Sequence, residues 1–519
     1  MNTTDFLSIA AAICPDRDFM VFEGSRWNYF ETSERINKLA NALSEMGVAK
    51  GDRIGVLSVN CPQYIEIYFA AAKAGAIFVP LNFRAKVDEL AYMIATSRAK
   101  VLFVGERYLQ MVKEQFPEIE GLEKCVSIDV PCEGMLTYED LIESGSDEEF
   151  FIEIDDDDVT ILMFTSGTTG RPKAVPQTHN TFSTYILENV DPADPEIEEK
   201  NIMTVPLYHV AGIQGMLAAV YGGRTLVLTR QFDVKDWLEL VQNEKANRAM
   251  LVPTMLKQVL DFPEFPNYDL SSLRVITYGA AAMPLEVIKR AIKAFPDVNF
   301  INAFGQTETG STITMLSPED HVITGTKEEQ EKKLNRLASS IGKPLPDVEV
   351  KIIDEKGEAL GPNQVGEIVA QGPRIMSGYW QDDEKTAQAF TSDGWLRTSD
   401  MGWMDEDGYI FLAGRADDMI IRGGENISPR EVEEVLLGNP KIAEAAIIGV
   451  ADEEWGQEVR AIVVLKENET AAEEEIIEYS RSKLASFKRP RSVIFVDELP
   501  RSALGKLSRK SLAQEYGQP

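Results

Sequence analysis

A run of glycine, serine and threonine residues ends in two cations at residues 165–173, with the sequence TSGTTGRPK. The two glycines leave the backbone free to curl around phosphate oxygens, and the hydroxyl groups can donate hydrogen bonds to them. Arg171 and Lys173 add positive charge at the end of the run. The Walker A pattern GxxxxGK[ST] does not fit this spacing. The residues therefore predict a phosphate-binding loop of another kind, although an ordinary polar surface loop has a similar composition.

Three apolar stretches lead into segments whose residues could bind a ligand or take part in a reaction, and each apolar stretch is expected to be a buried strand. VTILMF (159–164) precedes the loop at 165–173, while LRVITYG (273–279) and VNFINAFG (298–305) each end at a glycine. Between the last two, apolar residues on one face predict a helix that opens at Pro284. Open α/β sheets bind ligands at the carboxyl ends of their strands, and these three strands fit that rule.

The N-terminal part alternates helices with buried strands. A helix is expected from Thr32, as its N-cap, to a stop at Gly47, because its apolar residues fall on one face. The strand RIGVLSV (53–59) follows, and Pro62 starts a second, largely apolar helix that runs to Gly75. Since a helix that is apolar all round is buried, the pattern predicts a layered α/β domain.

From about residue 345 the pattern changes to short strands and tight turns, which indicates a β-rich subdomain. After Arg415, strand-like runs interleaved with charged helices indicate a smaller α+β unit. The polar segment GRADD (414–418) is the expected boundary. The predicted fold class is α/β, with a large N-terminal domain of layered α/β subdomains plus the β-rich subdomain (1–414) and a small α+β C-terminal domain (415–519).

Composition narrows the class of protein. The 519 residues exceed one compact core, and an apolar content of 44% allows sizeable cores. The formal net charge of −32 argues against nonspecific binding to nucleic acid or to an anionic membrane. The four cysteines show neither a CxxC pair nor zinc spacing, which is typical of reduced thiols in a cytoplasmic protein. Neither a signal peptide nor a stretch of about 20 apolar residues that would span a bilayer is expected.

The loop at 165–173 closely resembles the signature of the acyl-adenylate-forming superfamily, which comprises acyl-CoA synthetases, non-ribosomal peptide adenylation domains and luciferases. The resemblance covers nearly the whole chain, and its last part is most similar to bacterial acyl-CoA synthetases. The companion motifs follow in the superfamily's order: PLYHVAG (206–212), YGAAAMP (278–284), NAFGQTETG (302–310), GWLRTSDMG (394–402), GRADDMIIRGGENISPREVE (414–433) and PRSALGKL (500–507).

The resemblance implies a reaction and the residues that carry it. A carboxylate attacks the α-phosphorus of ATP, and because both are anions, catalysis depends on positioning and charge neutralisation. Lys506 is assigned to bridge the carboxylate and the α-phosphate, and Glu308 with Thr165 to hold Mg²⁺ against the phosphates. His209 is assigned to shape the acyl pocket and not to transfer a proton. As isolated residues, all of these are more often ordinary surface or structural groups.

The resemblance also implies binding residues for the nucleotide and for CoA. Asp400 and Arg415 are assigned to the ribose, and residues 279–281 to a flat wall beside the adenine, where a tight packing turn is the alternative. Arg422 and Lys488 are candidates for the CoA phosphates, with ordinary surface charge as the alternative. The full set is Thr165, Ser166, Gly167, Thr168, Thr169, Gly170, Lys173, Gly279, Ala280, Ala281, Asn302, Ala303, Phe304, Gly305, Thr307, Asp400, Arg415, Arg422, Gly423 and Gly424.

Two positions concern movement and local geometry. Asp417 matches the hinge of the superfamily, about which the mobile C-terminal domain is expected to rotate after adenylation. That rotation would remove Lys506 from the site and bring the segment 422–428 to it.

Ser399 stands where most members carry a glycine, directly before the ribose-binding aspartate. This departure questions the local loop geometry but leaves the role of the aspartate intact.

The acid and its acceptor are less defined. Residues 208–223 and 279–315 should line the acyl pocket; they are rich in Gly, Ala and Met, with Phe304 and Tyr208 as the main aromatics. They favour an apolar monocarboxylic acid, either a medium- or long-chain fatty acid or an alicyclic or aromatic acid. CoA is the expected acceptor. A carrier-protein loader, a silent protein of this fold and a luciferase-type oxidase are the alternatives. The expected partners are a small carboxylic acid, ATP and CoA, and nothing separates a monomer from a homodimer.

Overall fold

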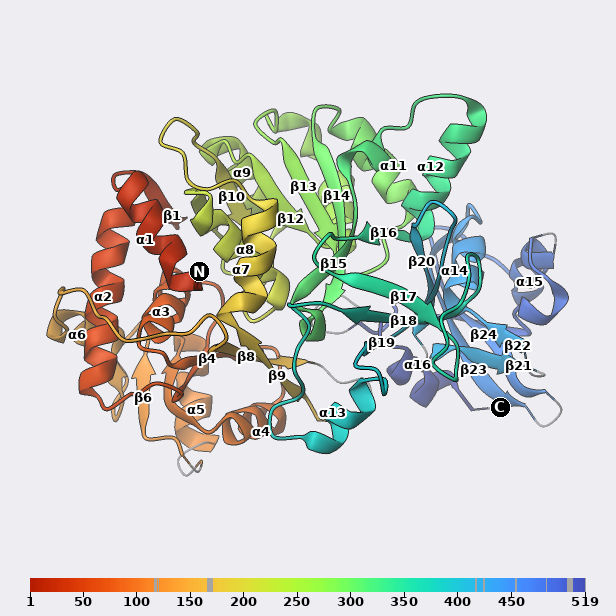
Figure 1. Ribbon diagram of the computed structural model, residues 1–519. Helices are drawn as coiled ribbons and strands as arrows, with labels where there is room; N and C mark the ends of the chain where they lie inside the picture. Colours follow the sequence, from red (N-terminus) through yellow and green to blue (C-terminus); the bar gives the residue numbers. More distant parts are fainter. Residues whose placement is uncertain are drawn as a thin grey trace.

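The mixed α/β class is confirmed, with a large N-terminal part and a smaller C-terminal part (Figure 1). The structure is a computed structural model of the chain. The residues that it describes are 1–115, 119, 121–165, 171–415, 418–422, 425–452, 455–481, 483–501 and 507–518, with only the backbone at 425 and 426.

The smaller of the two main sheets has the strand order β7-β6-β5-β3-β4-β8-β9. All neighbouring strands are parallel except β8 and β9, which form an antiparallel pair at one edge. The strands are β3 (Arg53–Leu57), β4 (Ile77–Pro80), β5 (Ala99–Val104), β6 (Lys124–Ser127), β7 (Leu136–Thr137), β8 (Val159–Thr165) and β9 (Lys173–Thr178). The predicted strands at 53–59 and 159–164 are therefore confirmed.

The larger sheet has the order β17-β18-β19-β20-β16-β15-β14-β13-β12-β10-β11-β1-β2. Strands β14 to β1 run parallel, while the part from β15 to β17 is antiparallel. It contains the β-rich strands predicted from about residue 345 and begins earlier, with β15 and β16. The strands are β1 (Asp18–Phe22), β2 (Ser25–Asn28), β10 (Lys200–Met203), β11 (Thr225–Leu228), β12 (Arg248–Leu251), β13 (Val275–Gly279), β14 (Asn299–Gln306), β15 (Ser311–Leu316), β16 (Ser340–Pro344), β17 (Glu349–Ile353), β18 (Gly366–Gln371), β19 (Leu396–Met404) and β20 (Ile410–Arg415).

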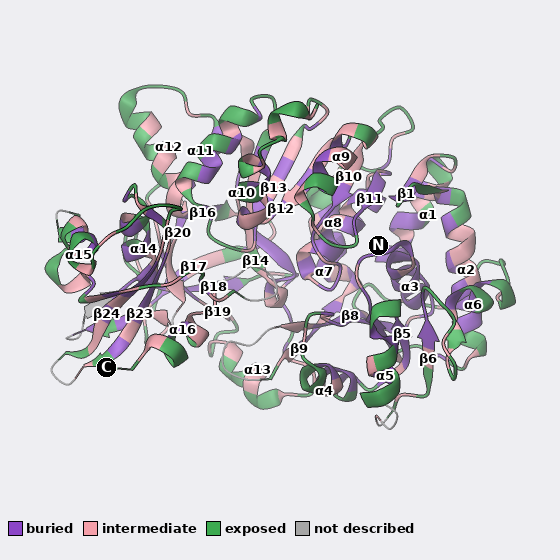
Figure 2. Cartoon of the chain, turned by 180° about the vertical axis from the view of Figure 1, so that it is seen from behind, coloured by how far each residue is buried: buried purple, intermediate pink, exposed green. Residues whose placement is uncertain are grey.

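One group of helices packs between the two sheets, in a hydrophobic core that takes residues from strands of both. It comprises α1 (Thr3–Ile13), α2 (Tyr29–Glu45), α3 (Pro62–Lys73), α6 (Tyr138–Ser144), α7 (His179–Asn189) and α8 (Val210–Tyr221). No residue of α3 or α8 is exposed, and both helices are largely purple in Figure 2. The prediction that the apolar helix at Pro62 is buried in a layered domain is confirmed.

Other helices cover the outer faces of the sheets. A separate core joins β10–β13 to α9 (Val234–Glu244), α10 (Pro253–Asp261), α11 (Leu285–Ala294) and α12 (Lys327–Ser339). The outer face of the smaller sheet packs against α4 (Val87–Ser97) and α5 (Leu109–Gln115). The helix α13 (Asp383–Ala389) and short 3₁₀ turns, η1 (Glu106–Tyr108), η2 (Phe265–Asn267) and η4 (Pro318–His321), complete this part.

The C-terminal part has an α+β arrangement with its own hydrophobic clusters. Its sheet has the order β23-β24-β25, and a separate hairpin pairs β21 with β22. The elements are β21 (Ile420–Arg422), β22 (Glu425–Ile427), α14 (Pro429–Leu437), β23 (Ile442–Asp452), β24 (Gly456–Leu465), α15 (Glu473–Arg481), η6 (Ser486–Lys488), β25 (Ser492–Phe495) and α16 (Arg509–Tyr516).

The expected start of α2 was wrong. The helix begins at Tyr29, and its N-cap is Asn28, which exchanges hydrogen bonds with Glu31 in a capping box. Thr32 lies within the first turn, where its hydroxyl donates to the carbonyl of Asn28. Both Asn28 and Thr32 could cap a helix from the sequence alone, because both side chains can accept a hydrogen bond from the first turn. Asparagine is the more favoured of the two at an N-cap.

In the part of the chain that the structure describes, no helix is long and apolar enough to cross a membrane.

A buried ion pair ties the segment after β18 to the turn before β17, and a hydrogen bond ties it to β15. The Arg374 side chain is fully buried, and its Nη2 donates to Asp347 Oδ1 at 3.0 Å. Its Nη1 also donates to the carbonyl of Thr312 at 2.8 Å. Because every polar atom that Arg374 removes from water needs a partner, this residue fixes the backbone around it.

Replacing Arg374 with methionine should leave the buried Asp347 carboxylate unpaired. We expect Arg374→Met to lower the free energy of unfolding by about 3–5 kcal/mol, as is typical when one partner of a buried pair is removed. Urea unfolding followed by tryptophan fluorescence measures this loss. Lys257→Met is the matched control, because Lys257 pairs with Asp261 at 2.8 Å on the surface and its loss should cost no more than about 1 kcal/mol. Equal losses in the two variants would contradict the anchoring role.

Candidate active site

The predicted phosphate loop connects the antiparallel strands β8 and β9, so its two ends lie side by side. Thr165 is paired with Lys173 across the two strands, and Thr165 Oγ1 donates to the carbonyl of Lys173 at 3.5 Å. Arg171 faces away toward Tyr92 on α4, 5.0 Å from its ring centroid. Ser166, Gly167, Thr168, Thr169 and Gly170 lie outside the described residues.

Glu308 is joined to the phosphate loop through a tyrosine that the sequence reasoning missed. It lies in η3 (Thr307–Thr309), directly after β14. Tyr379 Oη donates to Glu308 Oε1 at 3.1 Å and accepts from Lys173 Nζ at 3.4 Å. Burial, with the Glu308 carboxylate beside it, raises the pKa of Tyr379 well above its usual value, so the hydroxyl keeps its proton. Nothing in the local sequence around Tyr379 distinguishes it from an ordinary packed aromatic.

Asp400 and Arg415, the two residues predicted for the ribose, face each other on adjacent strands, β19 and β20. Arg415 Nη1 donates to Asp400 Oδ1 at 3.0 Å. The carbonyl of Thr398 accepts both from Arg415 Nη1 at 3.3 Å and from Gln306 Nε2 at 3.4 Å. Arg415 is also close enough to Tyr379 to oppose the rise of its pKa. Lys173 and Glu308 thus share Tyr379, and the carbonyl of Thr398 links Arg415 to Gln306, two residues before Glu308, so four predicted site residues from two sheets lie in one region.

The two glycine-rich motifs at the ends of β13 and β14 also lie side by side. Gly279 is paired with Ala303, and a Cβ on Gly279 would lie 2.2 Å from the carbonyl oxygen of Ala303. The tight packing turn considered for this segment is therefore present, and it is compatible with the proposed adenine wall. Ala280 has a left-handed φ of 64°, and Ala281 is exposed. Asn302 Nδ2 donates to the carbonyl of Ser340 at 3.4 Å.

Other predicted residues at the end of β14 lie nearby. Phe304 is half-buried and packs with the clusters of the β-rich subdomain. A Cβ on Gly305 would lie 1.6 Å from the carbonyl oxygen of Ser311, so only glycine fits there. The carbonyl of Thr307 accepts from Gln177 Nε2 at 2.5 Å, which ties η3 to β9. The motif is therefore held from both sheets.

His209 is the N-cap residue of α8, at the expected acyl side, and is half-buried. Helix α8 packs against β15, which continues from the Glu308 motif. Tyr208, expected to line the acyl pocket, instead packs in the core of the smaller sheet, with its ring centroid 5.3 Å from that of Phe83. The glycines and alanines of α8, with the residues of β15 that pack against this helix, thus remain the main candidates for the acyl pocket.

On the expected CoA side, Arg422 is only 6% exposed, which excludes an ordinary surface charge. Its guanidinium carbon lies 5.0 Å from the ring centroid of Trp455. Lys488 Nζ pairs with both carboxylate oxygens of Glu431 at 2.7 Å. Gly423, Gly424, the hinge residue Asp417 and the catalytic candidate Lys506 lie outside the described residues, so their roles stay predictions.

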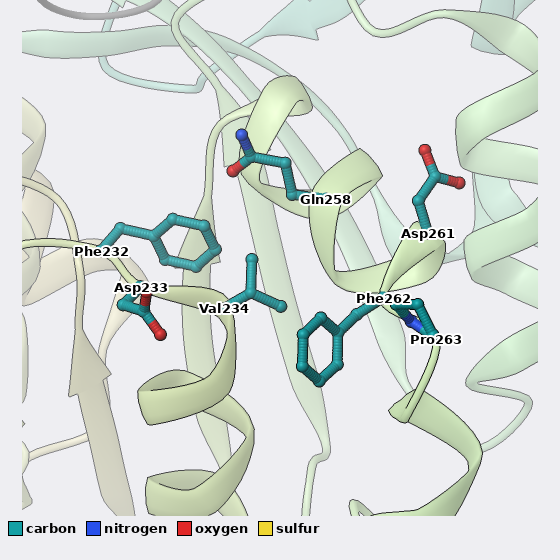
Figure 3. Close-up of a pocket in the computed structure, with 7 residues that line it drawn as sticks. All are labelled: Phe232, Asp233, Val234, Gln258, Asp261, Phe262 and Pro263. Atoms are coloured by element: carbon teal, nitrogen blue, oxygen red, sulfur yellow. The ribbon is translucent and has the colours of Figure 1, made fainter. Parts of the chain in front are cut away.

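A hollow of about 460 Å³ lies elsewhere, between the start of α9 and the end of α10 (Figure 3). Asp233 caps α9, and Asp261 pairs with Lys257 and Arg290, so the two carboxylates at its rim already have partners. No predicted site residue lines it. The lining residues are Phe232, Asp233, Val234, Gln258, Asp261, Phe262 and Pro263.

The surroundings of Glu308 would suit a magnesium ion held together with phosphate oxygens. Among the described residues, no three His, Cys, Asp or Glu side chains gather as a ligand set. Mg²⁺ is commonly held by one or two carboxylates together with phosphate oxygens, so a single half-buried carboxylate beside the phosphate loop suits it. The hydrogen bond from Tyr379 occupies Oε1 of Glu308 and fixes the orientation of the carboxylate.

Comparison with known proteins agrees with this geometry. Residues 7–380 match the AMP-binding enzyme family, and residues 431–506 match the AMP-binding enzyme C-terminal domain. The chain is 32% identical to an indoleacetate–CoA ligase of Aromatoleum aromaticum, over 99% of this chain and 98% of that protein. It is 32% identical to the mitochondrial medium-chain acyl-CoA ligase ACSF2 of Mus musculus, over 100% of this chain and 88% of that protein. The crystal structure of the anthranilate CoA ligase AuaEII with anthranoyl-AMP matches with a TM-score of 0.89 at 28% identity, covering 99% of this chain and 97% of that one.

Ser399 carries a backbone conformation that favours glycine. Its φ is 58°, in the left-handed region, directly before Asp400. A side chain in this region costs roughly 1–2 kcal/mol because Cβ approaches the following carbonyl oxygen. Within β19, the serine noted in the sequence therefore adopts a backbone conformation that favours glycine, at the expense of backbone strain.

Ser399→Gly should relieve this strain without moving Asp400. We expect unfolding free energy to stay equal or rise by up to about 1 kcal/mol, since glycine also has a more flexible unfolded state. Ser399→Val should lower it by roughly 1–2 kcal/mol, because a β-branched residue fits poorly at positive φ. Thermal unfolding of the two variants, with ATP affinity as a check on the loop, measures both effects. A glycine variant that is less stable than the valine variant would contradict the assignment of strain.

Proposed function

The chain belongs to the AMP-binding enzyme family and is an AMP-forming acid–thiol ligase, and we propose that it converts an apolar monocarboxylic acid into its CoA thioester. In the first half-reaction the carboxylate attacks the α-phosphorus of ATP, giving acyl-AMP and pyrophosphate. In the second, the thiol of CoA attacks the acyl carbon and AMP leaves. The observation that carries the proposal is that Lys173 and Glu308, joined by Tyr379, lie beside Asp400 and Arg415, which the carbonyl of Thr398 links to Gln306.

For the first half-reaction, the phosphate loop and Lys173 are proposed to bind the β- and γ-phosphates. Asp400 can accept hydrogen bonds from both ribose hydroxyls, while Arg415 donates to the same sugar. Lys506 is proposed to reach both the carboxylate and the α-phosphate, because an ammonium group between two anions lowers their repulsion. These cations stabilise negative charge more strongly where water is excluded, so substrate binding is expected to exclude water from the site.

Glu308, with the hydroxyl of Thr165, is proposed to hold Mg²⁺ at the phosphate side. The ion would neutralise charge on the pyrophosphate leaving group. The half-buried position of Glu308 and its hydrogen bond from Tyr379 support this role.

The acyl pocket is proposed to lie between α8 and β15, beside His209. The three cations of the lining segments 208–223 and 279–315 are Lys289, Arg290 and Lys293, and all are exposed on α11. No buried cation is therefore offered to a second carboxylate or to the carboxylate of an amino acid. An apolar fatty, alicyclic or aromatic acid suits these segments best.

The second half-reaction is proposed to require rotation of a C-terminal domain (415–519) against an N-terminal domain (1–414) about Asp417. In the present arrangement, α14 contacts the larger part through two hydrogen bonds. Ser428 Oγ donates to the carbonyl of Ala413, and Arg430 Nη2 donates to the carbonyl of Ala338 at 2.9 Å. Apart from the contacts of Arg415 at the end of β20, few hydrogen bonds cross this boundary among the described residues, which suits a boundary that opens and closes in each cycle.

Acid-dependent exchange of pyrophosphate into ATP tests the proposed function. Across aliphatic, alicyclic and aromatic acids, we expect exchange with at least one apolar monocarboxylic acid and little with dicarboxylic or amino acids. Adding CoA to the same assay should yield the thioester. If none of the acids supported exchange, the enzyme assignment would be contradicted. Exchange without thioester formation would point to a loader of carrier proteins.

A matched pair of aspartates controls this assay. Asp400→Asn should lose most of the exchange, because the amide can no longer accept from both ribose hydroxyls. Asp393→Asn should retain it, since Asp393 is an exposed turn residue that bonds Thr391.

Separating the half-reactions tests the domain rotation. Lys506→Ala should slow adenylation by about 100- to 1,000-fold, as loss of one charge-stabilising group commonly does. Thioester formation from supplied acyl-AMP and CoA should remain largely intact. Single-turnover measurements of each half-reaction report both rates, and an equal fall in the two would contradict the rotation.

A further inference from the structure

The segment 374–380 connects the two sheets at the nucleotide site. The amide of Trp380 donates to the carbonyl of Ala174 in β9 at 2.8 Å, and the amide of Met376 donates to the carbonyl of Glu308 at 3.0 Å. One end of the segment is therefore hydrogen-bonded to β9, the strand after the phosphate loop, and its middle is hydrogen-bonded to the turn that carries Glu308. A side chain on this segment can reach both groups.

The backbone around Tyr379 is fixed on both sides. Arg374 anchors the start of the segment through Asp347 and two backbone carbonyls. The amide of Tyr379 donates to Thr386 Oγ1 at 2.9 Å. A Cβ on Gly378 would lie 2.6 Å from Thr386 Cγ2, so the chain approaches α13 as closely as glycine allows. Tyr379 is thus held in place independently of any substrate.

The Tyr379 side chain stands between a cation and a carboxylate. Its hydroxyl accepts from Lys173 Nζ at 3.4 Å and donates to Glu308 Oε1 at 3.1 Å. The same ammonium lies 4.7 Å from the centroid of the tyrosine ring. Among the described residues, Lys173 and Glu308 form no direct ion pair. The phenol satisfies one hydrogen-bonding position on each group and keeps the two apart.

This separation has a consequence for binding. A lysine and a glutamate in direct contact would satisfy each other, and a metal–nucleotide complex would first have to break their ion pair. With the hydroxyl between them, Glu308 keeps an oxygen for the metal and Lys173 keeps donors for the phosphates. Residues that hydrogen-bond to a metal ligand orient it, and their loss commonly lowers the metal affinity.

We propose that Tyr379 is a positioning residue of the nucleotide site, which orients Glu308 toward the metal ion and keeps Lys173 from pairing with it. The proposal rests on the proposed function, because it assigns the phosphate side of ATP to these groups. Tyr379 itself does not contact the reacting atoms; it acts through Glu308 and Lys173.

The test is ATP binding measured by calorimetry without any acid, once with MgCl₂ and once with EDTA. Tyr379→Phe retains the ring and removes only the hydroxyl. We expect the gain in ATP affinity that Mg²⁺ provides to fall about tenfold in this variant, the lower end of the effect of losing a partner behind a metal ligand. ATP affinity in EDTA should change less.

A double variant separates positioning from a general structural effect. If Tyr379 acts through Glu308, Tyr379→Phe combined with Glu308→Gln should lose no more of the Mg²⁺-dependent gain than Glu308→Gln alone. Additive losses would overturn the proposal. Tyr409→Phe is the matched control, because Tyr409 also donates to a carboxylate, Asp320, at 2.6 Å but lies outside the site. It should retain the full gain, and thermal unfolding confirms that each variant is folded.

The outcomes distinguish this proposal from the proposed function. A full Mg²⁺-dependent gain in Tyr379→Phe would overturn the positioning role while acid-dependent pyrophosphate exchange still supported the ligase. A wild-type protein that binds no ATP under either condition would overturn both.

Discussion

The burial of α3 and α8 on nearly every side is the constraint on which the rest of the molecule depends. No residue of either helix is exposed, so each needs a layer on both faces, and the two main sheets supply them. Helices that are apolar all round cannot remain at a surface without a large hydrophobic cost. The sheets are thereby held at a fixed distance, and Lys173 at the start of β9 and Glu308 after β14 both reach Tyr379 where the layers end.

The candidate site is therefore a junction, and its charges are oriented by groups that cross it. Tyr379 links Lys173 of the smaller sheet to Glu308 of the larger one, and the carbonyl of Thr398 links Gln306 to Arg415. A reaction between two anions requires such preorganised charges, because reorienting them during the reaction would raise the barrier. The buried Arg374–Asp347 pair helps to hold this arrangement, although removing two charges from water has a desolvation penalty.

The sequence predicted local features well because their signals are local. Hydrophobic runs placed β8, β13, β14 and α3, and the ordered motifs indicated which loops to compare. Strand partners are non-local, so the pattern did not reveal that β8 belongs to a different sheet from β13 and β14. Tyr379 was missed for the same reason: its importance comes from Lys173 and Glu308, which lie far from it in the chain. Thr32 was mistaken for a cap because Asn28 offers the same chemistry one turn earlier.

The central claim is that acid activation occurs at this junction of the two sheets. A crystal structure with a non-reactive acyl-adenylate analogue, such as an acyl sulfamate of adenosine, tests it most directly. The account predicts the ribose hydroxyls within hydrogen-bonding distance of Asp400, the phosphate mimic beside the loop that ends at Lys173, and the acyl chain between α8 and β15. An analogue bound elsewhere, for example in the hollow between α9 and α10, would contradict it.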